Sequence, residues 1–445
     1  MSSTANECKE VFTSSIESLT DERQRWLFER STSLDDGVRR ATEGIVDRVR
    51  RDGDTALRSM ATEFDKVELD AIEVPRRAAR EALDRLDPAL RSALERTQRN
   101  LESVQRAFLP VMEETSPEPG IVVGRRPDPL DRVGVYAPGG RAAYPSSVLM
   151  GAVPARVAGV REIVLCSPPG PNGLPSSVVL AAAELADVDR IFALGGAGAI
   201  AAMAYGTESV PRVDRIVGPG NAYVAEAKMQ VAGVVAIDSP AGPSELLVVA
   251  DDSADAEVVA REVMAQAEHD PRAVVVVVAI GEAAASRIAA AIERAIDAEP
   301  RAVIIRESLG ERGAVLVASS LEECATFAAR FAPEHLLLAL SNARAALPRF
   351  RNAGTVFVGV RSSVAFGDYM TGANHVLPTG GLARSYSGLS VLDFIRWTTY
   401  QEVSAEGAAR LASDVGVFAD AEGLPAHAAT ARQWRIAGVG SEAAR

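Results

Sequence analysis

A glutamate and a histidine stand side by side in the segment Ala332-Pro-Glu-His335. A carboxylate and an imidazole in adjacent positions can serve as two proton-transfer groups that act on one bound substrate. Alone, such a dipeptide is more often a surface or helix-capping pair. The chain, however, has only four histidines, and the other three also lie in segments that can build a site. We therefore interpret Glu334 and His335 as a candidate acid–base pair.

The other polar clusters have the composition of a divalent metal site. Gln266 and His269 are three residues apart in a segment expected to be helical, so both side chains point from one helix face. An amide oxygen and an imidazole placed in this way can give two ligands to a divalent metal. Asp368, in a glycine-flanked loop, and His427, near the C-terminus, could complete a four-ligand site of nitrogen and oxygen atoms. For each residue alone, a hydrogen-bonded polar side chain is the more common case.

Three glycine-rich turns are candidate ligand-binding loops. Gly196-Ala-Gly-Ala-Ile-Ala201 follows an expected strand and opens a helix, so it fits the dinucleotide pattern GxGxxA, although small residues also pack well in such a position. A helix N-terminus with bare glycine backbone suits a pyrophosphate. In Gly218-Pro-Gly-Asn221, Asn221 is either a helix cap or a ligand contact. In Ala241-Gly-Pro-Ser-Glu245, Ser244 could serve only to stabilise the turn.

Composition narrows the class of protein. A chain of 445 residues exceeds one ordinary domain, and 47% hydrophobic with 24% charged residues is typical of a globular protein. The net charge of −13 argues against nucleic acid or an anionic membrane as partner, and no run approaches the roughly 18 apolar residues of a membrane span. The polar, acidic start without an apolar stretch favours a cytoplasmic location.

The three cysteines agree with a reducing compartment. Cys8, Cys166 and Cys324 lie far apart and show no CxxC spacing. This spacing excludes a cysteine zinc cluster and gives no disulfide framework.

The positions of these motifs depend on an expected alternation of short apolar strands and alanine-rich helices. Helices are expected between residues 35 and 108, and residues 390–445 are expected to be mostly helical. Strands are expected over 132–136, 162–166, 190–194, 215–217, 234–237, 246–250, 273–279, 302–305 and 313–317. The valine run in 273–279 is typical of a strand buried on both faces. The pattern predicts an α/β fold with two incomplete Rossmann-like domains, each a doubly wound parallel sheet, and helical N- and C-terminal extensions.

Longer motifs follow one another along the chain and carry a resemblance. They are Arg132-Val-Gly-Val-Tyr-Ala-Pro-Gly-Gly140, Ala143-Tyr-Pro-Ser-Ser-Val-Leu149, Val217-Gly-Pro-Gly-Asn-Ala-Tyr-Val224, Ala241-Gly-Pro-Ser-Glu245, Gln266-Ala-Glu-His269, Ala332-Pro-Glu-His335 and Asn374-His-Val-Leu-Pro-Thr379. In this order they resemble the histidinol dehydrogenase family, over roughly residues 35 to 430. Several blocks in order are far more specific than any single motif.

The resemblance implies an enzyme that oxidises L-histidinol to L-histidine through a bound histidinal, with one zinc per subunit and two NAD per turnover. It implies that Glu334 and His335 are the acid–base pair. The zinc ligands would be Gln266, His269, Asp368 and His427, which would also hold the substrate together with His335.

Further positions are implied in the same way. Ser244, His375 and Glu422 would contact the substrate, and Tyr136, Gly198 and Asn221 fall at positions near NAD. The family forms a homodimer with shared active sites, so Glu422 and His427 would act in the partner's site. Gly198 stands where the family usually has a glutamine, and Leu337 stands where it commonly has an acidic residue.

The expected domains follow from the resemblance and the change of composition in residues 110–129. An N-terminal arm would span residues 1–30. A first large α/β domain would combine 31–128 with 245–380, and a second Rossmann-like domain would span 129–244. Residues 381–445 would form a helical dimerisation segment.

Three alternatives stay open from the sequence. A relative with the same fold, zinc and NAD could act on another small polar alcohol, such as a sulfonated diol, although Glu422 could pair with the ammonium group of histidinol and favours that substrate. A zinc hydrolase would use Glu334 to activate water and would need no hydride acceptor. A binding protein without catalysis is disfavoured because every candidate catalytic side chain is present.

Overall fold

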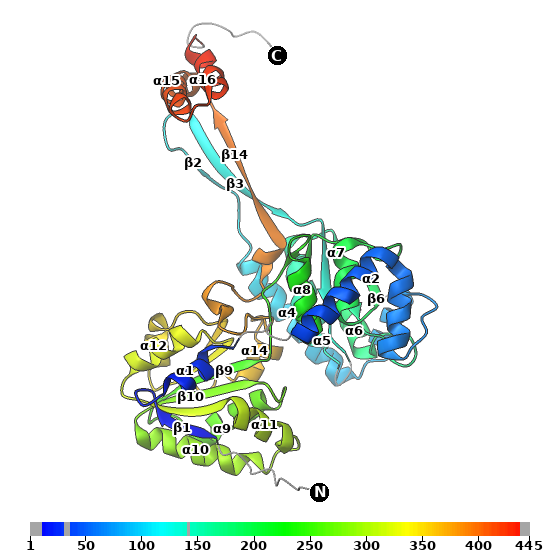
Figure 1. Cartoon of the computed structure of the whole chain (residues 1–445), viewed down its shortest axis with the longest axis vertical. Coiled ribbons are helices and arrows are strands. Elements are labelled where there is room, and N and C mark those ends of the chain that lie inside the picture. Colours follow the sequence, from blue (N-terminus) through cyan, green and yellow to red (C-terminus); the bar gives the residue numbers. More distant parts are fainter. Residues whose placement is uncertain (1–10, 31–35, 140–142, 437–445) are drawn as a thin grey trace. The chain divides into compact units, whose positions relative to one another are not determined.

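The computed structural model describes residues 11–30, 36–139 and 143–436, which fall into two compact units (Figure 1). The described part of unit 1 runs to Phe108 and continues over Leu130–Phe394. Unit 2 combines Leu109–Pro129 with the chain from Ile395 onward. Cys8 and positions 140–142, at the end of the first long motif, lie outside the described residues.

One half of unit 1 is built on a five-stranded parallel sheet of order β6-β5-β4-β7-β8. Its strands are β4 (Arg132–Tyr136), β5 (Glu162–Ser167), β6 (Arg190–Ala193), β7 (Arg215–Val217) and β8 (Ala236–Ile237). In chain order this is 3-2-1-4-5, the Rossmann arrangement without its sixth strand. The connecting helices are α5 (Pro145–Ala158), α6 (Ser177–Leu185), α7 (Gly196–Tyr205) and α8 (Ala222–Val231).

The helical N-terminal part packs against this same half. It consists of α2 (Asp36–Met60), the π-helix η1 (Ala61–Asp65), α3 (Arg76–Asp84) and α4 (Pro88–Ala107). α2 packs on α7 and α8, α3 on α6, and α4 on α5. Val46, Val49 and Leu57 of α2 join one buried cluster with Phe192 and Ile200. This packing differs from the sequence-based grouping of residues 31–128 with 245–380, because the apolar face of α2 is buried against the five-stranded half.

The other half of unit 1 is built on a six-stranded parallel sheet of order β1-β11-β10-β9-β12-β13. Its strands are β1 (Phe12–Ser15), β9 (Glu245–Ala250), β10 (Val274–Ile280), β11 (Gly313–Ala318), β12 (His335–Ala339) and β13 (Thr355–Val358). Without the edge strand β1, the order is again 3-2-1-4-5. Its longer helices are α1 (Asp21–Phe28), α9 (Ala256–Ala267), α10 (Glu282–Ile296), α11 (Ala302–Arg312) and α12 (Leu321–Phe331).

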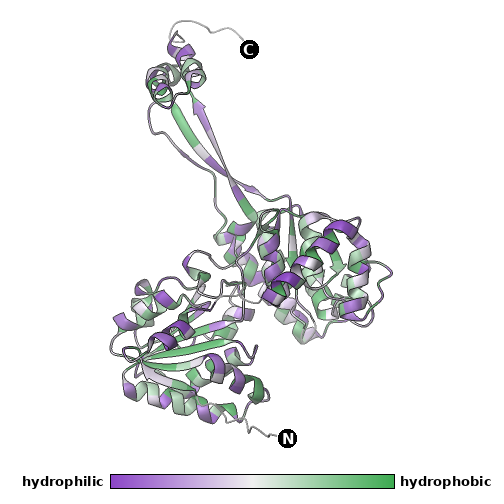
Figure 2. Ribbon diagram, in the orientation of Figure 1, coloured by the Kyte–Doolittle hydropathy of each residue, from purple (hydrophilic) through white to green (hydrophobic). Residues whose placement is uncertain are grey.

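The valine run of β10 is buried on both faces, as predicted. Val275 and Val277 belong to the cluster that includes residues of α9, α10 and α11, whereas Val276 and Val278 belong to the cluster that includes α12. Figure 2 shows the strands of this sheet as hydrophobic and the helices as mixed in character. Among the described residues, no helix combines the length and apolar character needed to cross a bilayer.

Shorter helices complete unit 1, and unit 2 is an antiparallel ribbon with helices. In unit 1 they are α13 (Ala343–Ala346), η2 (Leu347–Arg349), α14 (Val364–Tyr369), η3 (Leu382–Arg384) and η4 (Val391–Phe394). Unit 2 contains β2 (Glu113–Thr115), β3 (Ile121–Pro129), β14 (Ile395–Val403), α15 (Ala405–Ala421), α16 (Pro425–Arg432) and η5 (Gln433–Ile436). β14 pairs with β3 along its whole length (Figure 1).

The strand predicted over 302–305 is wrong, because these residues begin the helix α11. The run Ala-Val-Ile-Ile looks like a buried strand, but its burial follows helical spacing. Ile305 and Leu309, one turn apart, are buried, whereas Val303 is 80% exposed. The one-sided burial of a surface helix therefore overrides the local β-propensity.

Other strands occur where the sequence analysis expects none. β14 lies in the region predicted to be mostly helical, and β3 lies in the region 110–129 that was expected to separate domains. The edge strand β1 lies in the expected arm. β12 and β13 extend the six-stranded sheet on the other side of β9.

A buried ion pair holds the loop after β7. Lys228 Nζ pairs with Asp238 and donates to the backbone oxygen of Gly218 at 3.0 Å. The other oxygen of Asp238 accepts from the Gly218 nitrogen at 2.7 Å. Gly218 has φ +120°, and an added Cβ would lie 2.1 Å from the Tyr136 oxygen. The loop therefore depends on both a glycine and a buried charge pair.

We predict that Lys228→Met destabilises the fold by about 3–5 kcal/mol, because it leaves the Asp238 carboxylate buried without its partner. Burial already raises the pKa of Asp238, and the loss of Lys228 raises it further. When a carboxyl has a higher pKa in the folded than in the unfolded state, the folded protein loses stability as pH rises. The destabilisation by Lys228→Met should therefore grow from about pH 4 upward. Urea unfolding followed by circular dichroism measures it. Arg287→Met, which breaks an exposed pair with Asp252, is the control and should cost at most about 1 kcal/mol.

Candidate active site

A pocket of about 1440 Å³ lies within unit 1 and collects most of the predicted site residues. On one side it is lined by the loops that follow β4, β5, β6 and β7, at the carboxyl edge of the five-stranded sheet. On the other side it is lined by residues at the amino ends of β9 and β12, by the end of α9 and by residues between 368 and 379. The two sheets therefore present opposite edges to one cavity.

Glu334 and His335 enter this pocket at the start of β12. Helix α12 ends at Phe331; its C-cap Ala332 has the left-handed φ of 50°, and Pro333 follows before the strand begins. Both side chains are buried, at 6% and 4% exposure. Glu334 Oε2 accepts a hydrogen bond from the backbone nitrogen of Glu245 at 2.7 Å and lies 3.4 Å from His335 Nδ1. The adjacent pair predicted from the sequence thus forms one local cluster.

The tautomer of His335 follows from its backbone partner. Its Nδ1 lies 3.0 Å from the carbonyl oxygen of Glu245, and because a carbonyl only accepts, Nδ1 carries the proton. Nε2 is buried, lies 3.5 Å from Asp368 Oδ1 and makes no hydrogen bond with the described residues. Burial opposes the charged form, but the carboxylates of Glu334 and Asp368 outweigh it and raise the pKa of His335 well above its usual value. Nε2 is therefore the atom at which the imidazole gains or releases its second proton.

Three of the four predicted metal ligands line the pocket: Gln266, His269 and Asp368. Gln266 is 2% exposed on α9, and His269 follows the same helix. Burial alone would raise the pKa of Asp368, but His335, with the more distant His375 and His269, lowers it. An anionic carboxylate, an imidazole and an amide oxygen form a donor set that suits a divalent cation. Among the described residues, no group of three or more histidine, cysteine, aspartate or glutamate side chains could hold a metal ion, and Gln266 is of none of these types.

Glu422 and His427 belong to unit 2. Glu422 caps the end of α15, and His427 lies on α16; both are exposed. Neither lines the pocket of unit 1 in this chain.

The predicted substrate contacts Ser244 and His375 do line the pocket. Ser244 directly precedes β9, so its place is fixed by the sheet. His375 Nδ1 lies 2.9 Å from the carbonyl oxygen of Asp368 and therefore donates to it. Burial lowers the pKa of His375, so its ring favours the neutral form with Nε2 free of a proton.

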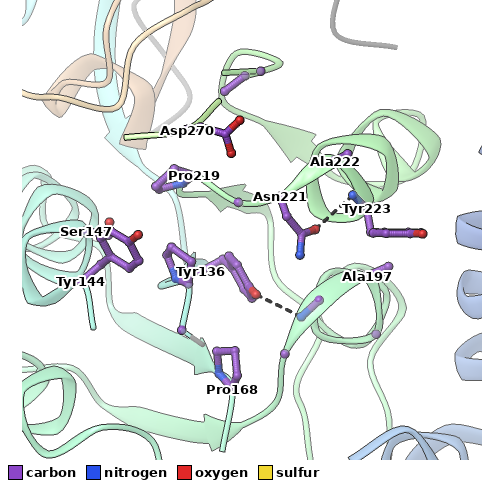
Figure 3. Close-up of a pocket in the computed structure, with 18 of the residues that line it drawn as sticks. Tyr136, Tyr144, Ser147, Pro168, Ala197, Pro219, Asn221, Ala222, Tyr223 and Asp270 are labelled. Carbon is purple, nitrogen blue, oxygen red and sulfur yellow. Dashed lines mark hydrogen bonds between the residues drawn. The ribbon is translucent and has the colours of Figure 1, made fainter. Parts of the chain in front are cut away.

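The predicted cofactor positions Tyr136, Gly198 and Asn221 line the opposite wall. Figure 3 shows the Tyr136 hydroxyl at the turn before α7, where it accepts from the Gly196 nitrogen at 3.0 Å. Burial raises the pKa of Tyr136 to about 12, so the phenol keeps its proton and can donate it. Asn221 Oδ1 caps α8 by accepting from Tyr223 and Val224, which leaves the amide nitrogen to donate to a ligand (Figure 3).

Close packing leaves little room for a long side chain at position 198. A Cβ there would lie 3.1 Å from Met60 Sδ and 3.6 Å from Leu57 Cδ2. Met60 and Leu57 line the same pocket from α2. A thioether therefore fills part of the space that a longer side chain at 198 would need.

Sequence reasoning did not single out Arg30 or Glu245, which contact the acid–base segment. Glu245 is only 1% exposed at the start of the apolar run Leu246–Ala250, and a charge at the head of a buried strand is a usable signal. Arg30 carries no such signal, because its partner lies more than 200 positions away. Leu337, the other departure from the family pattern, is fully buried in the core.

Comparisons with known proteins point to one family. A family model described as histidinol dehydrogenase matches residues 28–435. The histidinol dehydrogenase of Natronomonas pharaonis is 48% identical over 416 residues, which cover 93% of this chain and 97% of the relative. That of Methanosarcina barkeri is 44% identical over 417 residues, with 93% and 95% covered. The crystal structure of the enzyme from Elizabethkingia anophelis matches with a TM-score of 0.91 at 33% identity, covering 96% of this chain and 98% of that one.

The two Rossmann-like sheets around one pocket, together with these relatives, define an α/β oxidoreductase. The matched length and identity then specify the family. The chain belongs to the histidinol dehydrogenase family, whose activity is a dehydrogenase step of histidine biosynthesis.

Proposed function

We propose that this protein oxidises L-histidinol to L-histidine with two NAD, through histidinal that stays bound, and that it holds one zinc per subunit. The observation that carries the proposal is the buried Glu334–His335 pair beside Gln266, His269 and Asp368 in one pocket. A cytoplasmic location, expected from the sequence, is part of the same proposal.

His335 takes the proton in the first oxidation. Its Nδ1 proton is held by the Glu245 carbonyl, so Nε2 is the atom that accepts the proton of the substrate hydroxyl. The carbon bearing that hydroxyl loses a hydride at the same time, and histidinal results. Because His335 is buried, bulk water has little access to its Nε2.

Glu334 acts in the second oxidation. It takes a proton from the water that adds to the aldehyde, and the hydrate then loses a second hydride to give the carboxylic acid. Glu245 donates its backbone N–H to Glu334 Oε2 and so fixes the carboxylate beside the same reacting carbon as His335. The two steps need two different bases, and the pair supplies both.

Gln266, His269 and Asp368 would hold zinc with His427 of a second subunit. Zinc, when bound, supplies positive charge that orients the amine and imidazole nitrogens of histidinol. Ser244 and His375 lie in the same pocket and would contact the substrate, and Glu422 of the second subunit would pair with its ammonium group. The N/O character of the donor set and its carboxylate support this assignment.

NAD would lie against the opposite wall, near Tyr136, Gly198 and Asn221. NAD, when bound, accepts the hydride in each oxidation. Support comes from the turns at the starts of α7 and α8, which lie at the carboxyl edge of the sheet where Rossmann folds bind dinucleotides.

The first prediction from the proposed function concerns the number of NADH formed per histidinol. With purified protein, zinc and L-histidinol, absorbance should record two NADH for each histidinol consumed, and a chelator should abolish the reaction. Glu334→Gln and His335→Asn should each lower kcat by about 10²- to 10⁴-fold, because each removes a proton-transfer group.

The same assay separates the alternatives. NADH formed only from another polar alcohol, such as a sulfonated diol, would keep the mechanism and change the substrate. A chelator-sensitive hydrolysis without any NADH would replace the dehydrogenase proposal by a zinc hydrolase.

The second prediction concerns a shared site. If His427 acts in the partner's site, Glu334→Gln and His427→Asn are each inactive as homodimers, but their heterodimer contains one intact site. Co-expression with two affinity tags should therefore recover roughly half of the wild-type activity, one site of two. The control heterodimer combines Glu334→Gln in one subunit with His269→Asn in the other. Both residues lie in unit 1, so each of the two sites contains one altered residue. Activity from that control, or none from the test pair, would refute sharing.

The third prediction uses the departure at position 198. Gly198→Gln should weaken NAD binding, because its side chain must displace Met60. The double variant Gly198→Gln with Met60→Ala opens that space and adds one hydrogen bond, worth about 1 kcal/mol or roughly fivefold in Kd. Calorimetric titration with NAD measures both. Gly198→Ala is the control, since its Cβ meets only the flexible end of Met60 and the Leu57 methyl; tighter binding by Gly198→Gln alone would contradict the argument.

A further inference from the structure

A buried ion pair joins the N-terminal segment to the first residue of β9. Arg30 Nε donates to Glu245 Oε1 at 2.8 Å, and its Nη2 donates to Oε2 at 3.3 Å. The two side chains are only 3% and 2% exposed. The planar guanidinium therefore meets the carboxylate in a two-point arrangement away from water.

The remaining donors of Arg30 hold the ends of α1 and α12. Nη2 donates to the carbonyl oxygen of Phe331 at 2.6 Å, and Nη1 donates to that of Leu27 at 2.7 Å. The guanidinium also lies 3.5 Å from the centre of the Phe331 ring. Phe331 is the last residue of α12 and stands three positions before Glu334. One side chain thus ties together α1, α12 and β9.

Glu245 in turn contacts both members of the acid–base pair through its backbone. Its nitrogen donates to Glu334 Oε2, and its oxygen accepts from His335 Nδ1. Its side chain also accepts from the Gly380 nitrogen at 2.9 Å. A displacement of Glu245 would therefore move the partners of both Glu334 and His335 at once.

We infer that Arg30 and Glu245 are positioning residues that hold the Glu334–His335 pair in its reactive geometry. The inference rests on the acid–base role proposed above and goes beyond it, because it gives the N-terminal segment a part in the reaction.

The surroundings favour positioning over stability as the reason for this pair. Ion pairs taken out of water gain little net stability compared with apolar residues of similar size. Between Phe331 and Pro333 the chain passes through Ala332 with φ 50°, a conformation unfavourable for a residue with a Cβ. The Arg30 contacts hold Phe331, directly before this turn, and Glu245 of β9, which faces Glu334 and His335 after it. A turn held in this conformation needs such external support.

Arg30→Lys tests the inference without leaving Glu245 unpaired. A lysine keeps the positive charge but cannot donate from a planar fork to Glu245 and Phe331 together. The matched control is Arg330→Met. Arg330 is exposed and also links α12 to the N-terminal segment, by a hydrogen bond to Gln24 and by its place over the Phe28 ring.

The first readout is the ring N–H of His335. Because the chain has four histidines, protein labelled with nitrogen-15 in histidine gives a simple spectrum, and His335→Asn assigns the signal. The Nδ1 proton held by Glu245 should resonate downfield and exchange slowly with water. Arg30→Lys should shift this signal and speed its exchange, and Arg330→Met should leave it unchanged. An unchanged signal in Arg30→Lys overturns the inference, whether or not the protein oxidises histidinol.

The second readout is kinetic. Arg30→Lys should lower kcat for L-histidinol by about a hundredfold with little change in KM, since a misplacement of about 1 Å has such an effect. Arg330→Met should keep the wild-type kcat. In Arg30→Ala, millimolar guanidinium should restore part of the activity in a saturable way, and urea should not.

These outcomes separate the two proposals. No NADH from wild type refutes the proposed function, and the His335 signal then decides the positioning role alone. An active wild type with Arg30→Lys at full kcat refutes positioning only. We expect equal thermal unfolding midpoints for Arg30→Lys and Arg330→Met. If Arg30→Lys loses activity only because the protein unfolds, the inference is also overturned.

Discussion

The site depends on the pairing of β9 with β12. This parallel pairing sets Leu246 opposite His335, so that Glu245, one residue earlier, contacts the side chains of both Glu334 and His335 through its backbone. Backbone groups of a central strand are among the least mobile parts of a fold, because their neighbours on both sides are hydrogen-bonded. A strand of the core therefore determines which nitrogen of His335 carries the proton. The rigid sheet in turn fixes the positions of the Glu334 and His335 side chains.

The two sheets share one strand order but offer different edges to the pocket. The five-stranded sheet uses its carboxyl edge, where glycine turns and helix starts suit a dinucleotide. The six-stranded sheet uses its amino edge, where residues that precede strands, such as Ser244 and Glu334, project into the cavity. Duplicated topology thus provides two walls of different composition; in the proposed function, one wall supplies the bases and the other holds the hydride acceptor.

Much of the fold could be predicted, because its strands are continuous apolar runs between glycine turns. Seven of the predicted strands begin within one residue of the observed ones, from β4 to β11, whereas the short β8 begins two residues late. The acid–base and ligand positions stay predictions that depend on motif order, since spacing alone left them ambiguous. Arg30 could not be found, because its importance arises only when β9 and α12 meet. The run 302–305 was misread, because four apolar residues fit a strand and a helix equally until burial distinguishes them.

Buried charges in unit 1 support segments that line the pocket. Lys228 and Asp238 hold the loop before α8, and Arg30 and Glu245 hold the start of β12. Glu262, also buried, accepts from the Val364 nitrogen at the start of α14, the helix that carries Asp368. Removing a charge from water is costly, and apolar side chains fill a core at least as well. The placement of these charges therefore follows the demands of the site: each fixes by directed bonds a connection that non-directional apolar packing would leave less well defined.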